Sequence, residues 1–288
     1  MPRAVTKPTP TRRIVKKKTL TLGDLAQKAP TVKTTTLLYI ALLIAVFMSG
    51  YLYSRVQTLE KGGTTVTTAT SGTTPAAQPK ISLAKVKESF NKSKIKFGDT
   101  NKKLVIIEVA DPSCPYCSIA GGHNPELNKQ VGTQFTLVSD GGSYVAPVTE
   151  FRKLVDSGKA SFAYIYYPGH GNGELGTRAL YCAYDAGKFW EVHDALMTKE
   201  GYDLLNNTVK NDKAQAQTLA DFLSSAFDPT QMVSCLEGTK YDAQLKTDQT
   251  LATGLQIQGT PGFYLNDTAF PGAYNFTDME SAIKKAGI

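Results

Sequence analysis

The sequence predicts an α/β domain that carries a block of helices between its strands and follows one membrane-spanning helix. Three observations lead to this prediction. The β-branched apolar run LVIIEVA at 104–110 is typical of a central strand. Helical patterns dominate residues 173–254, and strand signals return after them. Residues 34–54 carry no charge, and a helix needs about 20 apolar residues to cross a bilayer.

The charge distribution favours a membrane location for residues 34–54. Residues 1–33 contain nine basic residues and one acidic residue, whereas the rest of the chain contains 23 basic and 24 acidic residues. Basic flanks stay on the cytoplasmic side, so we expect a cytoplasmic tail at 1–33 and an uncleaved, lipid-embedded signal anchor at 34–54. The remaining residues would lie outside the cytoplasmic membrane. Since the basic charge belongs to the tail, the sequence predicts no nucleic-acid partner.

A linker and a folded domain are expected after the anchor. Residues 55–80 are rich in Thr, Gly and Pro and lack helical or strand periodicity, which predicts a flexible tether. The folded domain is expected at 81–288. Its predicted elements are a short amphipathic helix at the start, strands at 104–110 and 161–169, helices over about 173–254, a strand, a Gly-Thr-Pro turn and another strand within 255–267, and a final short helix.

Two of the four cysteines, Cys114 and Cys117, lie in DPSCPYC directly after the strand at 104–110. A zinc site usually needs two closely spaced ligand pairs, but Cys182 and Cys235 are far apart in the sequence, so we predict no metal. A structural disulfide across two residues would remove little chain entropy. The pattern favours a redox pair, because free N–H groups at a helix N-terminus stabilise a thiolate.

The residues around the pair fit this interpretation. Pro115 is suited to the first helical position, where no N–H donor is needed. Cys117 follows Cys114 by about one helical turn and can attack a mixed disulfide formed there. We therefore expect Cys114 to react with the substrate and Cys117 to resolve the product.

The stretch KFGDTNKKLVIIEVADPSCPYC, together with GTPGFYLN at 259–266, resembles the DsbA-like thiol:disulfide oxidoreductases. The resemblance runs over roughly residues 81–288 and implies a thioredoxin fold with an inserted helical domain. It implies a cis peptide before Pro261, packed beside the cysteines, with the backbone of Thr260 available to an extended substrate. Pro115 and Tyr116 would also contact the substrate.

Glu108 lies inside the apolar strand, six residues before Cys114, where DsbA-like proteins often have a buried acid. Desolvation there would raise the pKa of Glu108 and let it exchange a proton with Cys117. The alternative is a carboxylate at the strand edge that points to water.

Two features concern the rest of the domain. Residues 119–145 depart from the long helix expected after Cys117, and this insertion of about 25 residues could be a lid, a substrate groove or a partner surface. Its His123 could tune the thiolate, but an exposed loop histidine is the simpler interpretation. Cys182 and Cys235 lie in helical patterns that resemble extracytoplasmic relatives, so we expect a structural disulfide between them; two buried free thiols are the alternative.

The sequence thus predicts a membrane-anchored thiol:disulfide oxidoreductase without a bound cofactor. Its most direct role is an oxidase that introduces disulfides into thiol-containing unfolded or exported proteins. The resemblance implies a membrane quinone-linked thiol oxidase as the redox partner. The alternatives are a disulfide reductase or isomerase of the same compartment, and a non-enzymatic tethered binding module with a structural CxxC.

Overall fold

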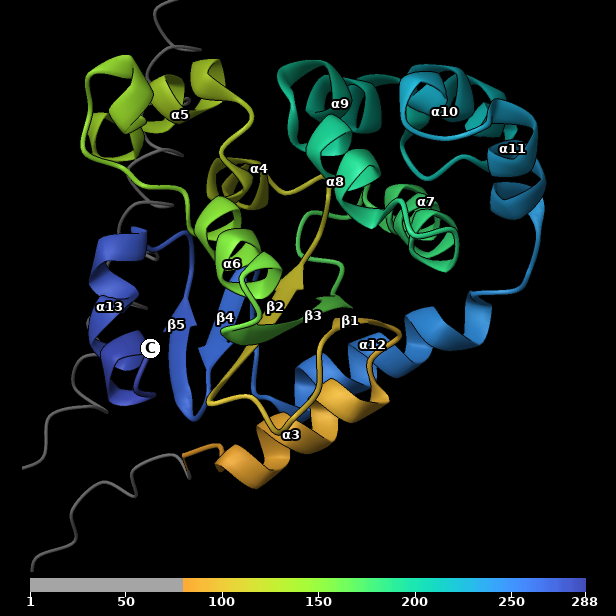
Figure 1. The fold of residues 1–288 in the computed structure, drawn as a ribbon. Helices are drawn as coiled ribbons and strands as arrows, with labels where there is room; N and C mark the ends of the chain where they lie inside the picture. Colours follow the sequence, from red (N-terminus) through yellow and green to blue (C-terminus); the bar gives the residue numbers. More distant parts are fainter. Residues whose placement is uncertain (1–79) are drawn as a thin grey trace, which may run out of the picture. The chain divides into compact units, whose positions relative to one another are not determined.

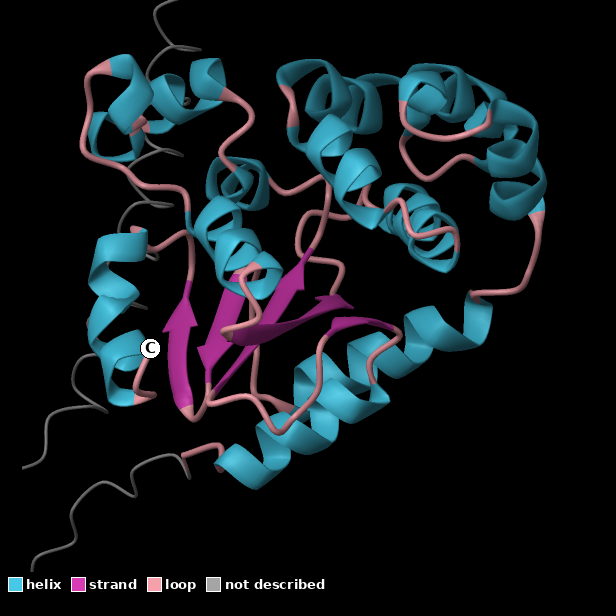
Figure 2. Cartoon of the chain, in the orientation of Figure 1, coloured by secondary structure: helices cyan, strands magenta, loops and turns pink. Residues whose placement is uncertain are grey.

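The computed structural model describes residues 80–288, which are built on a five-stranded sheet with the order β1-β3-β2-β4-β5 (Figures 1 and 2). The strands are β1 (Ile95–Phe97), β2 (Leu104–Ala110), β3 (Ala160–Tyr166), β4 (Gly262–Leu265) and β5 (Thr268–Pro271). Strands β2 and β3 run parallel, and the other neighbours are antiparallel. Every residue of β2 is buried, and a strand covered on both faces reads as a continuous apolar run.

The helices fall into three groups along the chain. Those before β3 are α3 (Leu83–Lys92), α4 (Pro115–Gly121), α5 (Pro125–Val131) and α6 (Pro147–Asp156). The block between β3 and β4 contains α7 (Glu174–Asp185), α8 (Phe189–Met197), α9 (Lys199–Asp203), α10 (Ala216–Phe222), α11 (Pro229–Glu237) and α12 (Asp242–Gly254). Helix α13 (Phe276–Lys285) follows β5. Short 3₁₀ turns lie at Thr133–Phe135, Val138–Asp140, Lys213–Gln215 and Leu223–Ser225, and a π-helical turn lies at Leu204–Val209.

The two faces of the sheet have separate apolar cores. Successive side chains of a strand point to opposite faces. Val105 and Ile107 of β2 pack with α3 and α12, which lie below the sheet in Figure 1. Leu104 and Ile106 belong to the larger core on the other face, with α4, α6 and the helical block. The same alternation directs Glu108 toward the face that α4 covers.

A disulfide joins Cys182 in α7 to Cys235 in α11. The two Cα atoms are 6.3 Å apart, and the residues are separated by 53 positions. Tyr181, next to Cys182, packs its ring 5.1 Å from that of Tyr241, which precedes α12. The helical block is therefore held by one covalent link and by aromatic packing at the same place.

Two strand predictions differ from the structure. Strand β1 was not predicted; it has three residues, too few for a period of two to be recognised. Residues 255–258 were predicted to be a strand, but they extend the end of α12. The Leu255 amide donates to Leu251 (2.9 Å), and the Ile257 amide donates to Ala252 (3.1 Å). The last helical carbonyls thus bind these N–H groups, so the strand predicted before the Gly-Thr-Pro turn is absent. The strand predicted after the turn is β4, and β5 was not predicted.

The predicted tail and anchor lie outside the described residues, as does the linker apart from Lys80. Among residues 80–288, none of the helices combines the length and the apolar character that a bilayer crossing requires.

Loss of the disulfide should destabilise the domain. Replacing both Cys182→Ala and Cys235→Ala opens a loop of about 54 residues in the unfolded state and lowers the free energy of unfolding by up to about 4 kcal/mol. Guanidinium denaturation of the full-length chain, without reductant, measures this change. The native chain treated with reductant should unfold at a similarly lowered midpoint. An unchanged midpoint in both experiments would contradict the prediction.

Candidate active site

The predicted redox pair lies at the junction between β2 and α4. Cys114 immediately precedes α4, and Pro115 is the first residue of the helix. The Cys117 amide donates to the Cys114 carbonyl (3.1 Å), so the second cysteine lies one turn further along. Both are reduced, and they are only 5% and 1% exposed. Tyr116 is 43% exposed, so the site presents this ring to solvent while both sulfurs are largely shielded.

A cis peptide bond between Thr260 and Pro261 lies against Cys114. The Cys114 thiol donates to the Thr260 carbonyl over 3.3 Å. Gly169 lies against the Thr260 side chain, and a Cβ atom at Gly169 would collide with the Thr260 hydroxyl. That hydroxyl is buried and has no hydrogen-bond partner within residues 80–288, so it can donate to a thiolate at Cys114. The four residues predicted to contact substrate are thus brought together with the cysteines.

The pKa of the Cys114 thiol is lowered from 9.0 to about 6. The largest cause is a hydrogen bond from the Cys117 thiol, which stabilises the Cys114 thiolate; burial opposes it. The Thr260 side chain and the backbone N–H groups of Cys117 and Tyr116 also lower the pKa. The helix N-terminus therefore contributes as predicted, but the neighbouring thiol contributes more.

Cys117 behaves in the opposite way. Burial raises the pKa of its thiol well above the ordinary value, and the hydrogen bond to Cys114 and the charge of Cys114 raise it further. The Asp111 amide, which donates to the Cys117 sulfur over 3.5 Å, only partly offsets this effect. Near neutral pH the reduced site therefore holds a thiolate at Cys114 and a protonated thiol at Cys117.

Glu108 is buried in the middle of β2, between Tyr164 of β3 and Phe263 of β4. Desolvation raises the pKa of its carboxyl from 4.5 to about 8, so it is largely protonated at neutral pH. Its Oε2 atom has no hydrogen-bond partner among the described residues. Its charge also raises the pKa of Cys117, which indicates that the two groups interact electrostatically. Its burial excludes the alternative of a carboxylate at the strand edge that points to water.

Asp111 is a site residue that the sequence analysis missed. Its Oδ1 atom accepts from the amide (2.8 Å) and the hydroxyl (2.6 Å) of Ser113. Its Oδ2 atom accepts from the amides of His170 (2.8 Å) and Gly171 (3.2 Å), in the loop after β3. A Cβ atom at Gly173 would collide with Oδ1. The turn chemistry of Asp-Pro-Ser and the closely spaced glycines of PGHGNG were the available signals.

The helical block supports the same turn. Asn206, in the π-helical turn, donates its side-chain amide to the Ser113 carbonyl (3.0 Å). Asn172 donates its backbone amide to the Ser113 hydroxyl (3.1 Å) and its side-chain amide to Asn206 (3.1 Å). The block thus helps to hold the residues that precede Cys114.

Residues 119–145, which we call the 119–145 segment, lie next to the cysteine pair. They contain the end of α4, then α5 and two 3₁₀ turns. The Phe135 ring packs edge-on against Tyr116, with 5.9 Å between ring centroids. On its other side it packs against Tyr144, with centroids 5.5 Å apart. The segment therefore places the half-buried Phe135 ring between the exposed Tyr116 and the buried Tyr144.

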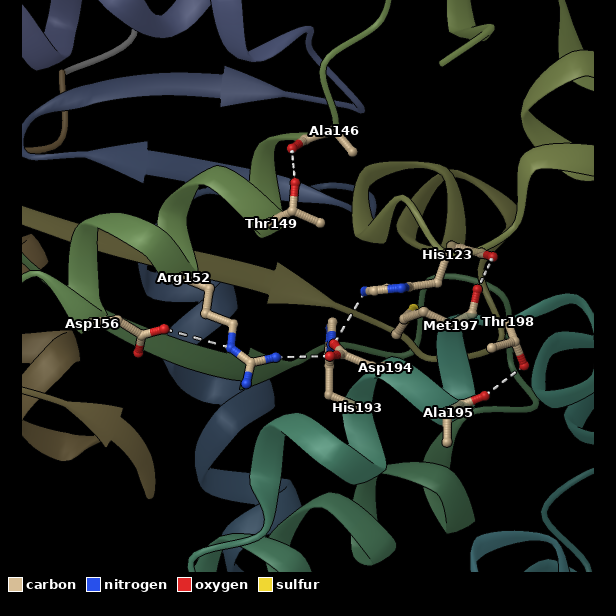
Figure 3. Close-up of polar contacts among 11 residues, drawn as sticks. His123, Ala146, Thr149, Arg152, Asp156, His193, Asp194, Ala195, Met197 and Thr198 are labelled. Carbon is tan, nitrogen blue, oxygen red and sulfur yellow. Dashed lines mark hydrogen bonds and ion pairs between the residues drawn. The ribbon is translucent and has the colours of Figure 1, made fainter. Parts of the chain in front are cut away.

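His123 binds a carboxylate on α8 (Figure 3). Its Nε2 atom is 3.2 Å from Oδ1 of Asp194, which also lies 3.0 Å from Nδ1 of the buried His193. Arg152 of α6 binds the other Asp194 oxygen over 2.8 Å. His123 therefore fastens the loop after α4 to α6 and α8. Within residues 80–288, no group of three or more His, Cys, Asp or Glu side chains is placed to hold a metal ion.

Comparison with known proteins agrees with this geometry. A protein-family profile described as Thioredoxin matches residues 148–285, a range that includes Pro261 and begins after both the cysteine pair and the 119–145 segment. Disulfide bond formation protein D of Bacillus subtilis (strain 168) is 20% identical over 194 residues, which are 65% of this chain and 74% of that protein.

Two crystal structures show the same arrangement of elements. Oxidised BdbD from Bacillus subtilis superposes with a TM-score of 0.50 at 18% identity, covering 68% of this chain and 94% of the other. Alpha-DsbA1 of Wolbachia pipientis superposes with a TM-score of 0.52 at 18% identity, covering 72% and 96%. The fold is thioredoxin-like. Together with the cysteine site, these relatives support thiol:disulfide oxidoreductase activity for the thioredoxin-like domain.

Removing the Cys117 thiol should raise the pKa of Cys114. In Cys117→Ala the thiolate loses its strongest hydrogen bond, so its transition should move upward from about pH 6 by about one unit or more. Ultraviolet absorbance of the thiolate, followed during titration of the reduced full-length chain, measures it. Cys117→Ser keeps a donor and should retain most of the lowering. Equal transitions in Cys117→Ala and the native chain would refute this explanation.

Replacing Glu108→Gln should stabilise the reduced protein at alkaline pH. The unfolded carboxyl ionises near pH 4.5 but the folded one near pH 8, so the native protein loses stability as the pH rises through this range. The variant should exceed the native stability by up to about 5 kcal/mol at pH 8 and match it near pH 4.5. Chemical denaturation at both pH values tests this, with exposed Glu126→Gln as the control. An identical pH dependence in Glu108→Gln and the native protein would contradict the prediction.

Proposed function

We propose that this chain is a thiol:disulfide oxidase that introduces disulfides into thiol-containing exported proteins. The observation that carries the proposal is the lowered pKa of Cys114, about 6, beside a Cys117 whose pKa is raised. A stabilised thiolate favours the reduced form of the pair, so the oxidised form becomes a better acceptor of electrons. At pH 7 a thiol with a pKa of about 6 favours the reduced form by about 1.4 kcal/mol, or about 30 mV.

The first step is attack by a substrate thiolate on the Cys114 sulfur of the oxidised pair. A substrate–Cys114 disulfide forms, the Cys114–Cys117 bond breaks, and the Cys117 sulfur leaves with the electron pair. Because the pKa of Cys117 is high, this sulfur must take up a proton, and the protonated Glu108 supplies it. In the oxidised pair and in the mixed disulfide the Cys114 sulfur carries no hydrogen, so the Thr260 carbonyl, which accepts from the reduced thiol, is free to accept an N–H of the substrate backbone.

The second step releases the oxidised substrate. A second substrate thiolate attacks the substrate sulfur of the mixed disulfide, and Cys114 leaves as a thiolate. Its lowered pKa makes it a good leaving group. The substrate has then lost two electrons, and the Cys114–Cys117 pair has gained them.

The proposal places this chemistry outside the cytoplasmic membrane. Residues 34–54 would anchor the chain, and a membrane quinone-linked thiol oxidase would reoxidise the cysteine pair. The uncharged run at 34–54 after a basic tail supports the anchor. The Cys182–Cys235 disulfide supports an oxidising compartment, since such bonds are rare in reducing ones. The similarity to a protein named for disulfide bond formation supports the direction of the reaction.

The reduction potential of the Cys114–Cys117 pair tests the proposal. Equilibration of the full-length chain with glutathione should give a potential nearer about −120 mV, typical of a strong oxidant, than about −270 mV, typical of thioredoxin. The Cys114→Ser variant should show no transition and serves as the control. A potential near the thioredoxin value would favour a reductase, and no transition in the native chain would favour a binding module.

A further inference from the structure

Basic residues are concentrated at the start of the folded domain. Residues 80–103 contain eight lysines and two acidic residues, whereas residues 104–288 contain 13 basic and 21 acidic residues. The first segment therefore carries a net charge of +6, and the rest of the domain carries −8. An anionic surface would attract the first segment and repel most of the remaining domain.

Helix α3, which lies in this basic segment, forms one outer face of the domain together with α12. Both helices pack on the same face of the sheet, opposite the face that carries the two cysteines, and they lie below the sheet in Figure 1. The groove between them has a volume of about 380 Å³. Three lysines line it, Lys85 and Lys92 of α3 and Lys246 of α12, together with one acidic residue, Glu88.

The acidic groups of the two helices are either neutralised or buried. Glu88 is the only acidic residue of α3, and its carboxylate binds Lys85 (3.1 Å) and Lys92 (2.6 Å). Along the middle and end of α12, Lys246 is the only exposed charged side chain, since Asp248 is fully buried. The solvent-facing side of the two helices therefore carries an excess of positive charge.

We call this surface the basic face. It comprises Glu88 and five lysines, Lys80, Lys85, Lys87, Lys92 and Lys246, so its net charge is +4. Leu83, the first residue of α3, is 38% exposed and lies among these lysines in the sequence. At a bilayer, an exposed leucine can enter the headgroup region while neighbouring lysines bind phosphate groups. The composition of the basic face thus suits an anionic lipid surface.

The chain enters the domain at the basic face. Lys80 comes shortly before α3, and residues 55–80, the predicted linker, join it to the uncharged run at 34–54. A flexible chain of this length has an end-to-end distance of about 25–30 Å. A bilayer that holds residues 34–54 would therefore lie within reach of this face. The sheet separates the face from the cysteines, so contact with lipid leaves the redox site uncovered.

We propose that the basic face binds the anionic phospholipid headgroups of the membrane in which residues 34–54 would be anchored. This inference rests on the part of the proposed function that places residues 34–54 in a membrane. The bound domain lies with α3 and α12 on the lipid. The opposite face of the sheet, with Cys114 and Cys117, then points away from the bilayer toward exported substrates.

Lysine acetylation of the full-length chain tests this inference. The chain is reconstituted into nanodiscs of phosphatidylcholine, or of phosphatidylcholine with phosphatidylglycerol, and mass spectrometry measures the acetylation rate of each lysine. Lys87, Lys92 and Lys246 should react about threefold to fivefold more slowly on the anionic nanodiscs. Lys153, exposed on α6 at the other face of the sheet, should react equally on both. In about 1 M salt, where the Debye length is about 3 Å, the difference should disappear.

Charge reversal on the basic face should abolish the protection. In Lys87→Glu with Lys246→Glu the net charge of the face falls from +4 to 0, so Lys92 should react at the same rate on both kinds of nanodisc. Lys153→Glu with Lys188→Glu is the matched control, because it makes the same change of charge at exposed positions in α6 and before α8; Lys92 should stay protected. Circular dichroism identifies a variant that has lost its fold, and the salt dependence of the native chain then still decides the question.

The outcomes separate this inference from the proposed function. A chain that does not co-purify with phosphatidylcholine nanodiscs contradicts the anchor, and salt-sensitive co-purification with the anionic nanodiscs would then still support the basic face. Equal reaction of Lys87, Lys92 and Lys246 on neutral and anionic nanodiscs, or protection that survives the charge reversal, overturns only the basic face inference. Equal protection on both nanodiscs relative to the chain in detergent would mean that this chain or a second copy covers the face, which also overturns it.

Discussion

Four hydrogen bonds to the Asp111 carboxylate hold the turn between β2 and α4 against the loop after β3. A buried carboxylate without such partners would be strongly destabilising, so neither loop can move away without a large loss of free energy. The same loop after β3 carries Gly169, whose missing side chain leaves room for the Thr260 hydroxyl. The buried Asp111 carboxylate therefore determines the position of Cys114 at the end of this turn and the position of Thr260 beside it.

The charge distribution around the sulfurs follows from this fixed geometry. Three acidic groups, Cys114, Cys117 and Glu108, share a largely apolar region, where ionisation of one group disfavours ionisation of the next. Cys114 has the hydrogen-bond donors, so it ionises first, and the other two keep their protons near neutral pH. Of these three groups, only Cys114 is largely ionised near neutral pH. Because Cys114 ionises first, it acts as the nucleophile and the leaving group. Cys117 keeps its proton and therefore needs a proton donor when its sulfur leaves.

Much of this site could be predicted from the sequence because its signals are local. The strand at 104–110, the cysteine spacing and the Gly-Thr-Pro turn each lie within a few residues, so their chemistry can be read directly. The contacts of Asp111 could not, because its partners His170 and Gly171 lie about 60 positions away. The same limit explains Phe135: a single aromatic residue in an irregular segment has no periodicity that would place it on Tyr116. The strand predicted at 255–258 failed because the end of α12 binds its N–H groups, a competition that the apolar pattern does not show.

Thr260, whose carbonyl oxygen accepts from the Cys114 thiol, lies 146 positions after Cys114 in the sequence. While the ribosome is still synthesising the chain, Cys114 and Cys117 are already present but Thr260 is not. During that interval the Cys114 thiol lacks the Thr260 side chain, one of the groups that lower its pKa. Completion of translation, followed by pairing of β4 with β2, therefore brings the last of these groups to Cys114.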